Sequence, residues 1–278
     1  MNIVSSLIKK IRSRLFPLRI SGLSEIRSFC KGKKGLEIGG PSAMFTWKGK
    51  IPIYSIVGSL DVCNFSNTTM WEGKISEGHH FQFHPKREAG FQYISEASDL
   101  SKIENEKYDF LLASHVLEHC ANPIKALSEW KRVLKDNGML LMILPHRDGT
   151  FDHNRKITSF EHLLDDFQRG TGEDDQTHAE EFISMIDLSM TGYGSDRKTF
   201  EERTRNNFGF RGMHHHVFDT RSAVKLADHS GFEILNVQTI LPFHIVIVAR
   251  KDSSNNNTRW MSPSASFKRT SPFLSDKN

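Results

Sequence analysis

The chain has 278 residues, of which 37% are hydrophobic and 25% charged, a composition typical of a soluble protein with one sizeable core. No stretch reaches the roughly 18 to 20 consecutive apolar residues that cross a bilayer, and the first residues lack the pattern of a secretion signal. Three cysteines without a CxxC pair exclude a disulfide framework and a thiolate zinc site. We therefore expect a cytoplasmic protein.

Charge is distributed unevenly along the chain, whose net charge is +4. Residues 1–34 carry a local charge of +8 and residues 251–278 one of +3, which leaves −7 for residues 35–250. An acidic body argues against binding nucleic acid through the protein surface. We therefore expect no nucleic-acid partner.

Residues 1–32 form a basic N-terminal region. Within residues 1–20, apolar side chains recur at helical spacing beside lysines and arginines. Such a helix either packs against the domain or lies on an anionic membrane surface. The pattern favours packing, and peripheral membrane contact through residues 1–20 is the alternative.

Apolar runs separated by turn signals predict seven strands. They lie at residues 35–40, 51–62, 91–97, 108–115, 138–146, 232–240 and 244–250. One helix is predicted after Asn122, with Pro123 in its first turn and Gly138 at its end, and another at 219–230. This alternation predicts an α/β, Rossmann-like, open and mostly parallel seven-stranded sheet with a C-terminal antiparallel hairpin.

Two segments depart from this pattern, one within the main domain of residues 33–251 and one after it. Residues 147–217 are rich in carboxylates and lack a convincing strand, which predicts a largely helical insertion after the fifth strand. Because insertions at the carboxyl ends of strands lie over the ligand crevice of such sheets, we interpret it as a lid. Residues 252–278 are rich in Ser, Asn and Pro, which indicates a disordered tail.

The stretch "KGLEIGGPS" at residues 34–42 reads as a strand that enters a ligand-binding turn. Glu37 points away from its apolar neighbours, and Gly39 and Gly40 let the backbone pass close to a ligand. A carboxylate ahead of the turn favours a cationic ligand, whereas a pyrophosphate would need free amides at a helix N-terminus. The stretch also lacks GxGxxG and the Gly-Lys-Ser/Thr ending of a phosphate loop, which weakens dinucleotide and ATP interpretations.

In these features the chain resembles the class I S-adenosylmethionine-dependent methyltransferases, of the type 11 kind, whose first strand ends in an acid-x-glycine motif. The stretch "YDFLLASHVLEHCANPIKALSEWKRVLKDNGMLLMILPHR", residues 108–147, looks like the fourth strand, helix and fifth strand of that family. The resemblance covers about residues 33–146 and does not explain residues 147–217.

The resemblance implies S-adenosyl-L-methionine as cofactor and a set of contact residues, matched by their order along the chain. Glu37, Gly39 and Gly40 would approach its amino-acid portion, Asp61 its ribose, and Glu96 with Ala97 its adenine, with Asp99 as alternate acid and with Ser114 and His115 following the fourth strand. The alternatives are that Asp61 merely ends a strand and that Glu96 is a solvated loop acid.

Methyl transfer to a hydroxyl group is helped by a general base within hydrogen-bond reach, most often a histidine or a carboxylate. Candidates gather after the fourth and fifth strands and in the insertion. We select His115, His146, Asp152 and His214 as the candidate catalytic residues.

The run "MHHHVFDT" at residues 213–220 invites a metal interpretation. In an extended backbone His214 and His216 face one way and His215 the other, so at most two adjacent ligands share a face. Neither HExxH nor a Cys/His spacing is present. Structural or hydrogen-bonding histidines are therefore favoured over a metal site, and no metal is predicted.

The function expected from this reasoning is methyl transfer to a small polar acceptor, by preference a hydroxyl of a sugar or glycan intermediate in polysaccharide biosynthesis. The alternatives are a catalytically silent cofactor-binding module and a nicotinamide-dependent reductase. The sequence leaves the oligomeric state and the identity of the acceptor open.

Overall fold

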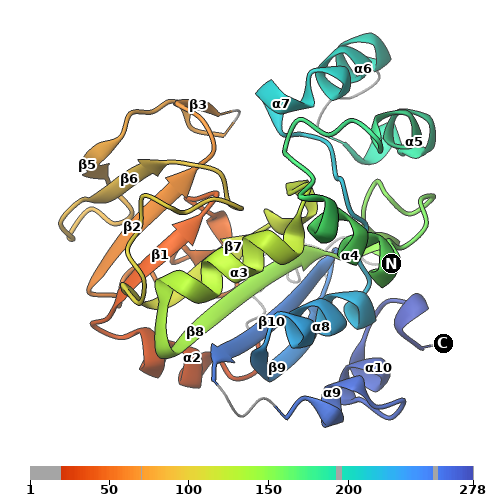
Figure 1. Cartoon of the computed structure of the whole chain (residues 1–278). Coiled ribbons are helices and arrows are strands. Elements are labelled where there is room, and N and C mark those ends of the chain that lie inside the picture. The colour runs from red at the N-terminus through yellow and green to blue at the C-terminus, as the bar shows by residue number, and fades with distance from the viewer. Residues whose placement is uncertain (1–19, 70, 192–195, 253–255, 278) are drawn as a thin grey trace, which may run out of the picture.

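The computed structural model describes residues 20–69, 71–191, 196–252 and 256–277. Its centre is an eight-stranded sheet with the strand order β5-β6-β2-β1-β7-β8-β10-β9 (Figure 1). The strands are β1 (Lys34–Ile38), β2 (Ser59–Asn64), β5 (Gly78–Phe81), β6 (Gly90–Ile94), β7 (Tyr108–Ser114), β8 (Leu134–Pro145), β9 (Phe232–Ile240) and β10 (His244–Lys251). A separate two-stranded sheet joins β3 (Thr68–Thr69) and β4 (Gly73–Lys74). The basic helix expected near the N-terminus lies outside the described residues.

The sheet confirms the predicted α/β architecture. Strands β6, β2, β1, β7 and β8 pair in parallel, while β10 runs antiparallel to both β8 and β9. This sheet has one strand more than the expected seven, because β5 pairs antiparallel with β6 and forms the edge of the sheet. This short strand carries the exposed His79 and His80, so it lacks the apolar pattern that marks a strand in the sequence.

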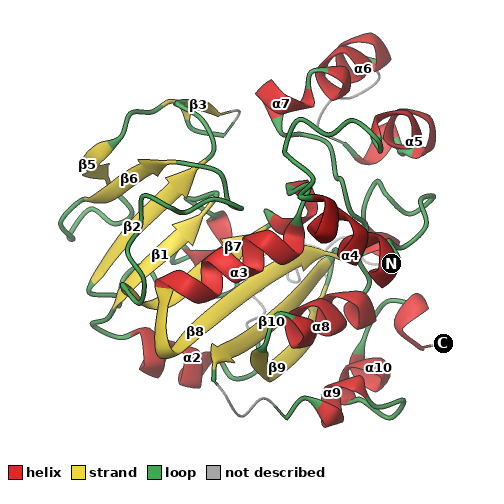
Figure 2. Ribbon diagram, viewed as in Figure 1, coloured by secondary structure: helices red, strands yellow, loops and turns green. Residues whose placement is uncertain are grey.

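Helices cover both faces of the sheet (Figure 2). On one face α3 (Pro123–Val133) and α8 (Thr220–His229) pack on side chains such as Leu111 and Leu140. On the other face α2 (Leu23–Cys30) packs on their chain neighbours Phe110 and Leu141. Each central strand therefore buries both its faces, which explains the continuous apolar runs in the sequence.

The helix ends follow the capping residues of the sequence. The Asn122 side chain accepts a hydrogen bond from the Lys125 amide at 3.0 Å and caps α3, and Asp219 caps α8 through a capping box. The helix α3 ends earlier than predicted, because β8 begins at Leu134 and takes Gly138 into the sheet.

The second predicted strand is displaced along the chain. The apolar residues Ile51 and Ile53 are fully buried, yet they belong to a loop, and β2 begins only at Ser59. In the register of β1 and β2, Asp61 lies opposite Leu36, and the strand ends at Asn64.

The insertion is helical, as expected from its sequence. It holds α4 (Phe160–Arg169), α5 (Ala179–Met185), α6 (Arg197–Arg205) and α7 (Asn207–Phe210). A small core of its own forms around Phe182, Ile183, Phe200 and Met213. Short 3₁₀ helices elsewhere span Ala43–Phe45, Leu117–His119, Arg147–Gly149, Leu188–Met190 and Ser275–Lys277.

The tail predicted to be disordered is folded against the domain. It forms α9 (Thr258–Met261) and α10 (Ser266–Thr270), and Trp260 and Phe267 enter the main core. Its polar composition indicated disorder, whereas three spaced aromatic residues of the segment, the third being Phe273, are buried. Among the described residues no helix combines the length and the apolar character needed to cross a membrane.

Candidate active site

A cavity of about 290 Å³ lies at the carboxyl ends of β1, β2, β6 and β7, and we call it the strand-end cavity. Its wall includes Gly39 after β1, Asn64 at the end of β2, Glu96 after β6 and Ser114 at the end of β7. Carboxyl ends of neighbouring parallel strands meet at one edge of a sheet, where ligands of such folds bind.

The turn after β1 needs its two glycines for different reasons. Gly39 has a positive φ of 71°, and a Cβ atom there would come within 2.7 Å of Val116 Cγ2. A Cβ atom on Gly40 would lie 2.4 Å from the carboxyl carbon of Glu37. The turn therefore packs as closely as bare backbone allows.

Glu37 lies beneath this turn and does not line the strand-end cavity. Its carboxylate accepts hydrogen bonds from the Ser42 amide at 2.9 Å and from the Tyr54 hydroxyl at 2.6 Å. Burial raises the pKa of Glu37 to about 8, against the opposing effect of these hydrogen bonds. The residue is placed to hold the turn in shape.

Asp61 is also absent from the cavity wall. It lies inside the sheet, where its carboxylate accepts hydrogen bonds from the Phe91 amide at 2.9 Å and the Tyr108 hydroxyl at 2.8 Å. Asn64, three residues on, lines the cavity in its place. Its Nδ2 donates to the Gly40 carbonyl at 3.0 Å, while its buried Oδ1 has no partner within the protein.

Glu96 and Ala97, the expected adenine contacts, line the cavity, and the insertion adds a cation there. Arg211 Nη2 lies 2.5 Å from Oε1 of Glu96, and its Nη1 lies 2.7 Å from Oε2 of Glu173. Burial raises the pKa of Glu96 to about 7, although Arg211 opposes this rise.

A second cavity, of about 820 Å³, adjoins the first, and we call it the histidine cavity because His115, His119, His214 and His244 line it. Ser42, Ser114, His115 and His119 line both cavities. His115 follows β7 with a positive φ of 57°, a conformation that is costly for a residue with a side chain and that recurs at functional sites.

Two of these histidines are held neutral. Burial lowers the pKa of His119 to about 4 and that of His244 to about 3. His119 Nδ1 lies 3.0 Å from the Met213 carbonyl, and His244 Nδ1 lies 3.0 Å from His115 Nε2. At neutral pH both rings therefore offer one donor and one acceptor.

Glu118 supplies a buried carboxylate to the wall of the histidine cavity. Its Oε1 lies 3.4 Å from His115 Nδ1 and 3.9 Å from His119 Nε2, and neither oxygen has a hydrogen bond of good geometry. A carboxylate beside an imidazole stabilises the protonated ring.

Asp152 stands behind His214 and does not line either cavity. The distance between Asp152 Oδ2 and His214 Nδ1 is 2.5 Å, and Arg155 donates to the other carboxylate oxygen at 2.9 Å. This arrangement fixes the orientation of the His214 ring.

The structure contradicts the selection of His146 as a catalytic residue. Its ring is fully buried, lines neither cavity and stacks on Phe273 of the tail at 4.0 Å. Its Nε2 lies 3.2 Å from Oδ1 of Asp276. The folded tail, which the sequence reasoning missed, therefore explains this histidine.

Sequence reasoning also missed Asn64, Glu118, Arg211 and His244 at the site. The end of β2 would have indicated Asn64, had the strand been placed correctly. Glu118 and His244 adjoin predicted strands but carried no separate signal. Arg211 reaches the cavity only through the fold of the insertion.

Comparison with known proteins identifies part of the chain. Residues 78–142, which run from β5 into β8, match the family model of a methyltransferase domain. The chain carries a class I S-adenosylmethionine-dependent methyltransferase domain. No curated protein sequence matches the chain.

Several solved methyltransferase structures resemble this one. A SAM-dependent methyltransferase from Aquifex aeolicus is 12% identical, with 88% of this chain and 97% of that chain covered and a TM-score of 0.44. One from Methanosarcina mazei is 17% identical, with 84% and 98% covered and a TM-score of 0.45. A protein from Thermotoga maritima described as a possible histamine N-methyltransferase is 17% identical, with 89% and 96% covered and a TM-score of 0.42. At such TM-scores the methyltransferase assignment rests on the family match and the strand order.

Proposed function

We propose that this methyltransferase transfers a methyl group to a hydroxyl of a small polar acceptor, a sugar or glycan intermediate, held in the histidine cavity. The observation that carries the proposal is that the strand-end and histidine cavities share His115, His119, Ser42 and Ser114. Methyl transfer requires the acceptor oxygen close to the cofactor and screened from water, and two adjoining cavities provide this arrangement.

The strand-end cavity fits S-adenosylmethionine, whose sulfonium supplies an activated methyl group when it is bound. The backbone at Gly39 lies in the wall of this cavity without a side chain to keep a ligand away. Asn64 Oδ1 and Ser114 Oγ are buried without partners and can pair with polar groups of a ligand. Glu96 provides an acceptor for an amino group.

The lining of the histidine cavity suits a hydroxyl-rich acceptor. The neutral rings of His119 and His244 each use Nδ1 within the protein, and their Nε2 atoms can form hydrogen bonds with hydroxyl groups. Lys48 and Lys50 also line this cavity, and their charge favours an acceptor that carries a phosphate or a carboxylate as well.

His115 is the residue we assign as general base, since it lines both cavities. Its Nε2 is directed to the acceptor side, where it now meets His244, and takes the hydroxyl proton as the new bond to the methyl carbon forms. Glu118, 3.4 Å from Nδ1, stabilises the ring once it is protonated. His214, oriented by Asp152, positions the acceptor.

Release of S-adenosylhomocysteine in the presence of UDP-linked and GDP-linked sugars tests this function. We expect turnover with a sugar, with the methyl group found on oxygen by NMR of the product. Methylation confined to nitrogen or carboxylate acceptors, or cofactor binding without turnover on any sugar, would overturn the proposal.

A matched pair of variants tests the base. His115→Gln should lower kcat about 100-fold, the contribution expected of a general base. The control His80→Gln changes an exposed histidine of β5 and should leave kcat unchanged. A loss of less than threefold in His115→Gln would remove His115 from this role.

A further inference from the structure

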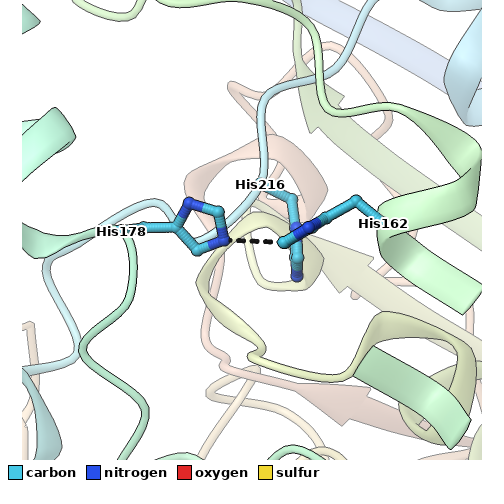
Figure 3. A group of neighbouring side chains, drawn as sticks. All are labelled: His162, His178 and His216. Atoms are coloured by element: carbon cyan, nitrogen blue, oxygen red, sulfur yellow. Dashed lines mark hydrogen bonds between the residues drawn. The ribbon is translucent and has the colours of Figure 1, made fainter. Parts of the chain in front are cut away.

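Three histidines from separate parts of the insertion converge outside both cavities. His162 lies on α4, His178 precedes α5, and His216 precedes α8 (Figure 3). One ring nitrogen from each lies within 4.8 Å of the other two. His162 Nε2 and His178 Nε2 are 2.9 Å apart, as the dashed line in Figure 3 marks.

A carboxylate completes the group. Asp166 lies one helical turn beyond His162 on α4, and its side chain is only 5% exposed. Its Oδ2 is 3.2 Å from His162 Nε2 and 3.8 Å from His216 Nε2. Its Oδ1 accepts a hydrogen bond from the Thr171 hydroxyl at 3.0 Å, which fixes the carboxylate so that Oδ2 faces the histidines.

Hydrogen bonds within the protein do not satisfy this group. The His162–His178 contact uses one proton, and His216 Nε2 meets the Ala121 carbonyl at 3.2 Å. Asp166 Oδ2 and His216 Nδ1 remain buried without a hydrogen-bond partner. An unpaired buried acceptor is unfavourable, so the folded chain gains if a cation pairs with Asp166 Oδ2.

The spacing matches the first coordination sphere of a metal ion. In a tetrahedral zinc site with bonds of 2.0–2.1 Å, neighbouring ligand atoms are about 3.3 Å apart. Three of the separations, 2.9, 3.2 and 3.8 Å, lie near that value, and the ligand nitrogens of the three histidines lie within 4.8 Å of one another. Glu181 Oε2, 3.6 Å from His178 Nδ1, supplies the carboxylate that commonly orients a metal-binding imidazole.

We propose that His162, His178, His216 and Asp166 bind one zinc ion. Three imidazoles and one carboxylate without a thiolate form a set that zinc accepts in tetrahedral geometry, and four protein ligands leave no open position for a reaction. The site is therefore structural. It ties α4, the start of α5 and the segment before α8 together, and it fixes His216 two residues from His214 of the histidine cavity.

The sequence argued against a metal because the run at 214–216 places at most two adjacent ligands on one face and neither HExxH nor a Cys/His spacing is present, although Asp148, Asp152 or His153 could have completed a set. The structure separates that run. His214 faces Asp152, His215 Nδ1 lies 3.7 Å from Asp175, and His216 joins ligands from two other elements.

Metal content of the full chain, produced without a histidine tag in zinc-containing medium, tests the proposal. We expect about one zinc per chain by plasma mass spectrometry in the wild type and less than a tenth of that in His178→Gln and in Asp166→Asn. His80→Gln, on the exposed edge strand, should keep the full amount. A wild type without zinc that also fails to take up added Zn²⁺ overturns the site.

A second cluster in the described residues, Glu118, His119 and His214, must be distinguished from this one. Zinc that is lost in His119→Gln and kept in His178→Gln would place the ion there and refute the proposal.

Replacement of zinc by Co²⁺ in the wild type adds a readout that does not depend on the folding of a variant, since tetrahedral N₃O ligation gives intense visible absorption. An octahedral spectrum contradicts the proposed ligand set. Neither readout uses methyl transfer, so the zinc site and the proposed acceptor fail or succeed separately.

Discussion

Arg211 Nη2 lies 2.5 Å from Glu96 Oε1, and this ion pair joins the helical insertion to the wall of the strand-end cavity. The same guanidinium holds Glu173 at 2.7 Å and lies over the rings of Phe65 and Phe208. Because Arg211 separates two partly buried carboxylates, its loss leaves like charges facing each other at the site.

Arg211→Gln should therefore weaken the binding of S-adenosylmethionine about tenfold, the equivalent of about 1.4 kcal/mol. Without the guanidinium the pKa of Glu96, already raised to about 7, rises further, and the carboxylate is protonated at neutral pH. Calorimetric titration with the cofactor measures the effect. Lys198→Gln, which removes an exposed cation from α6, is the matched control, and equal affinities for the two variants would contradict the expected role of Arg211.

Asn64 and Asp61 give a paired test of the cofactor wall. Asn64→Leu replaces the unpaired amide oxygen by an apolar group of similar size and should weaken cofactor binding tenfold or more. Asp61→Asn should leave that affinity within about threefold and lower the melting temperature instead, because this carboxylate holds Phe91 and Tyr108. Calorimetry and thermal unfolding of both variants separate the two roles. A loss of cofactor affinity in Asp61→Asn together with unchanged affinity in Asn64→Leu would assign the ribose contact to Asp61.

These two residues also show where sequence reasoning reaches its limit. The order of strands and helices followed from the apolar pattern, because each central strand is buried on both faces. The apolar pattern did not predict where β2 begins. Ile51 and Ile53 are as apolar as strand residues, but they belong to a loop. Asp61, the expected ribose contact, lies inside β2, and Asn64 at the end of that strand lines the strand-end cavity.

Contacts between distant segments were harder to foresee. His162, His178 and His216 meet only because α4, α5 and the segment before α8 pack together, and no local spacing encodes that packing. The tail was misread for a related reason. Its overall composition is polar, whereas its fold depends on a few buried aromatic residues such as Trp260 and Phe267.

Glu37 should make the stability of the protein depend on pH. Its pKa rises from 4.5 to about 8 on folding, chiefly through burial, so the folded state binds more protons than the unfolded state between these values. The free energy of unfolding therefore falls as pH rises through this window, by up to about 1.4 kcal/mol per pH unit. Glu37→Gln removes the titrating group and keeps an oxygen for the Ser42 amide.

We expect Glu37→Gln to flatten this profile and to exceed the wild type in stability at pH 8 to 9. Urea unfolding at pH 5, 6, 7, 8 and 9 measures it. Glu88→Gln, at an exposed position, should keep the wild-type slope. A Glu37→Gln profile as steep as that of the wild type would assign the dependence to other groups.

Asp276 in the folded tail should matter for stability and not for chemistry. Its carboxylate lies 3.2 Å from His146 Nε2 and accepts hydrogen bonds from the Thr220 hydroxyl at 2.7 Å and the Ser271 hydroxyl at 2.6 Å. Asp276→Ala leaves these buried groups unpaired and should lower the free energy of unfolding by about 3 kcal/mol. At temperatures where the variant is folded, kcat should stay within about threefold of the wild type, since the tail touches neither cavity through this residue. Lys277→Ala, at the exposed neighbour, should change neither quantity. A large fall in kcat with unchanged stability would restore His146 as a catalytic candidate.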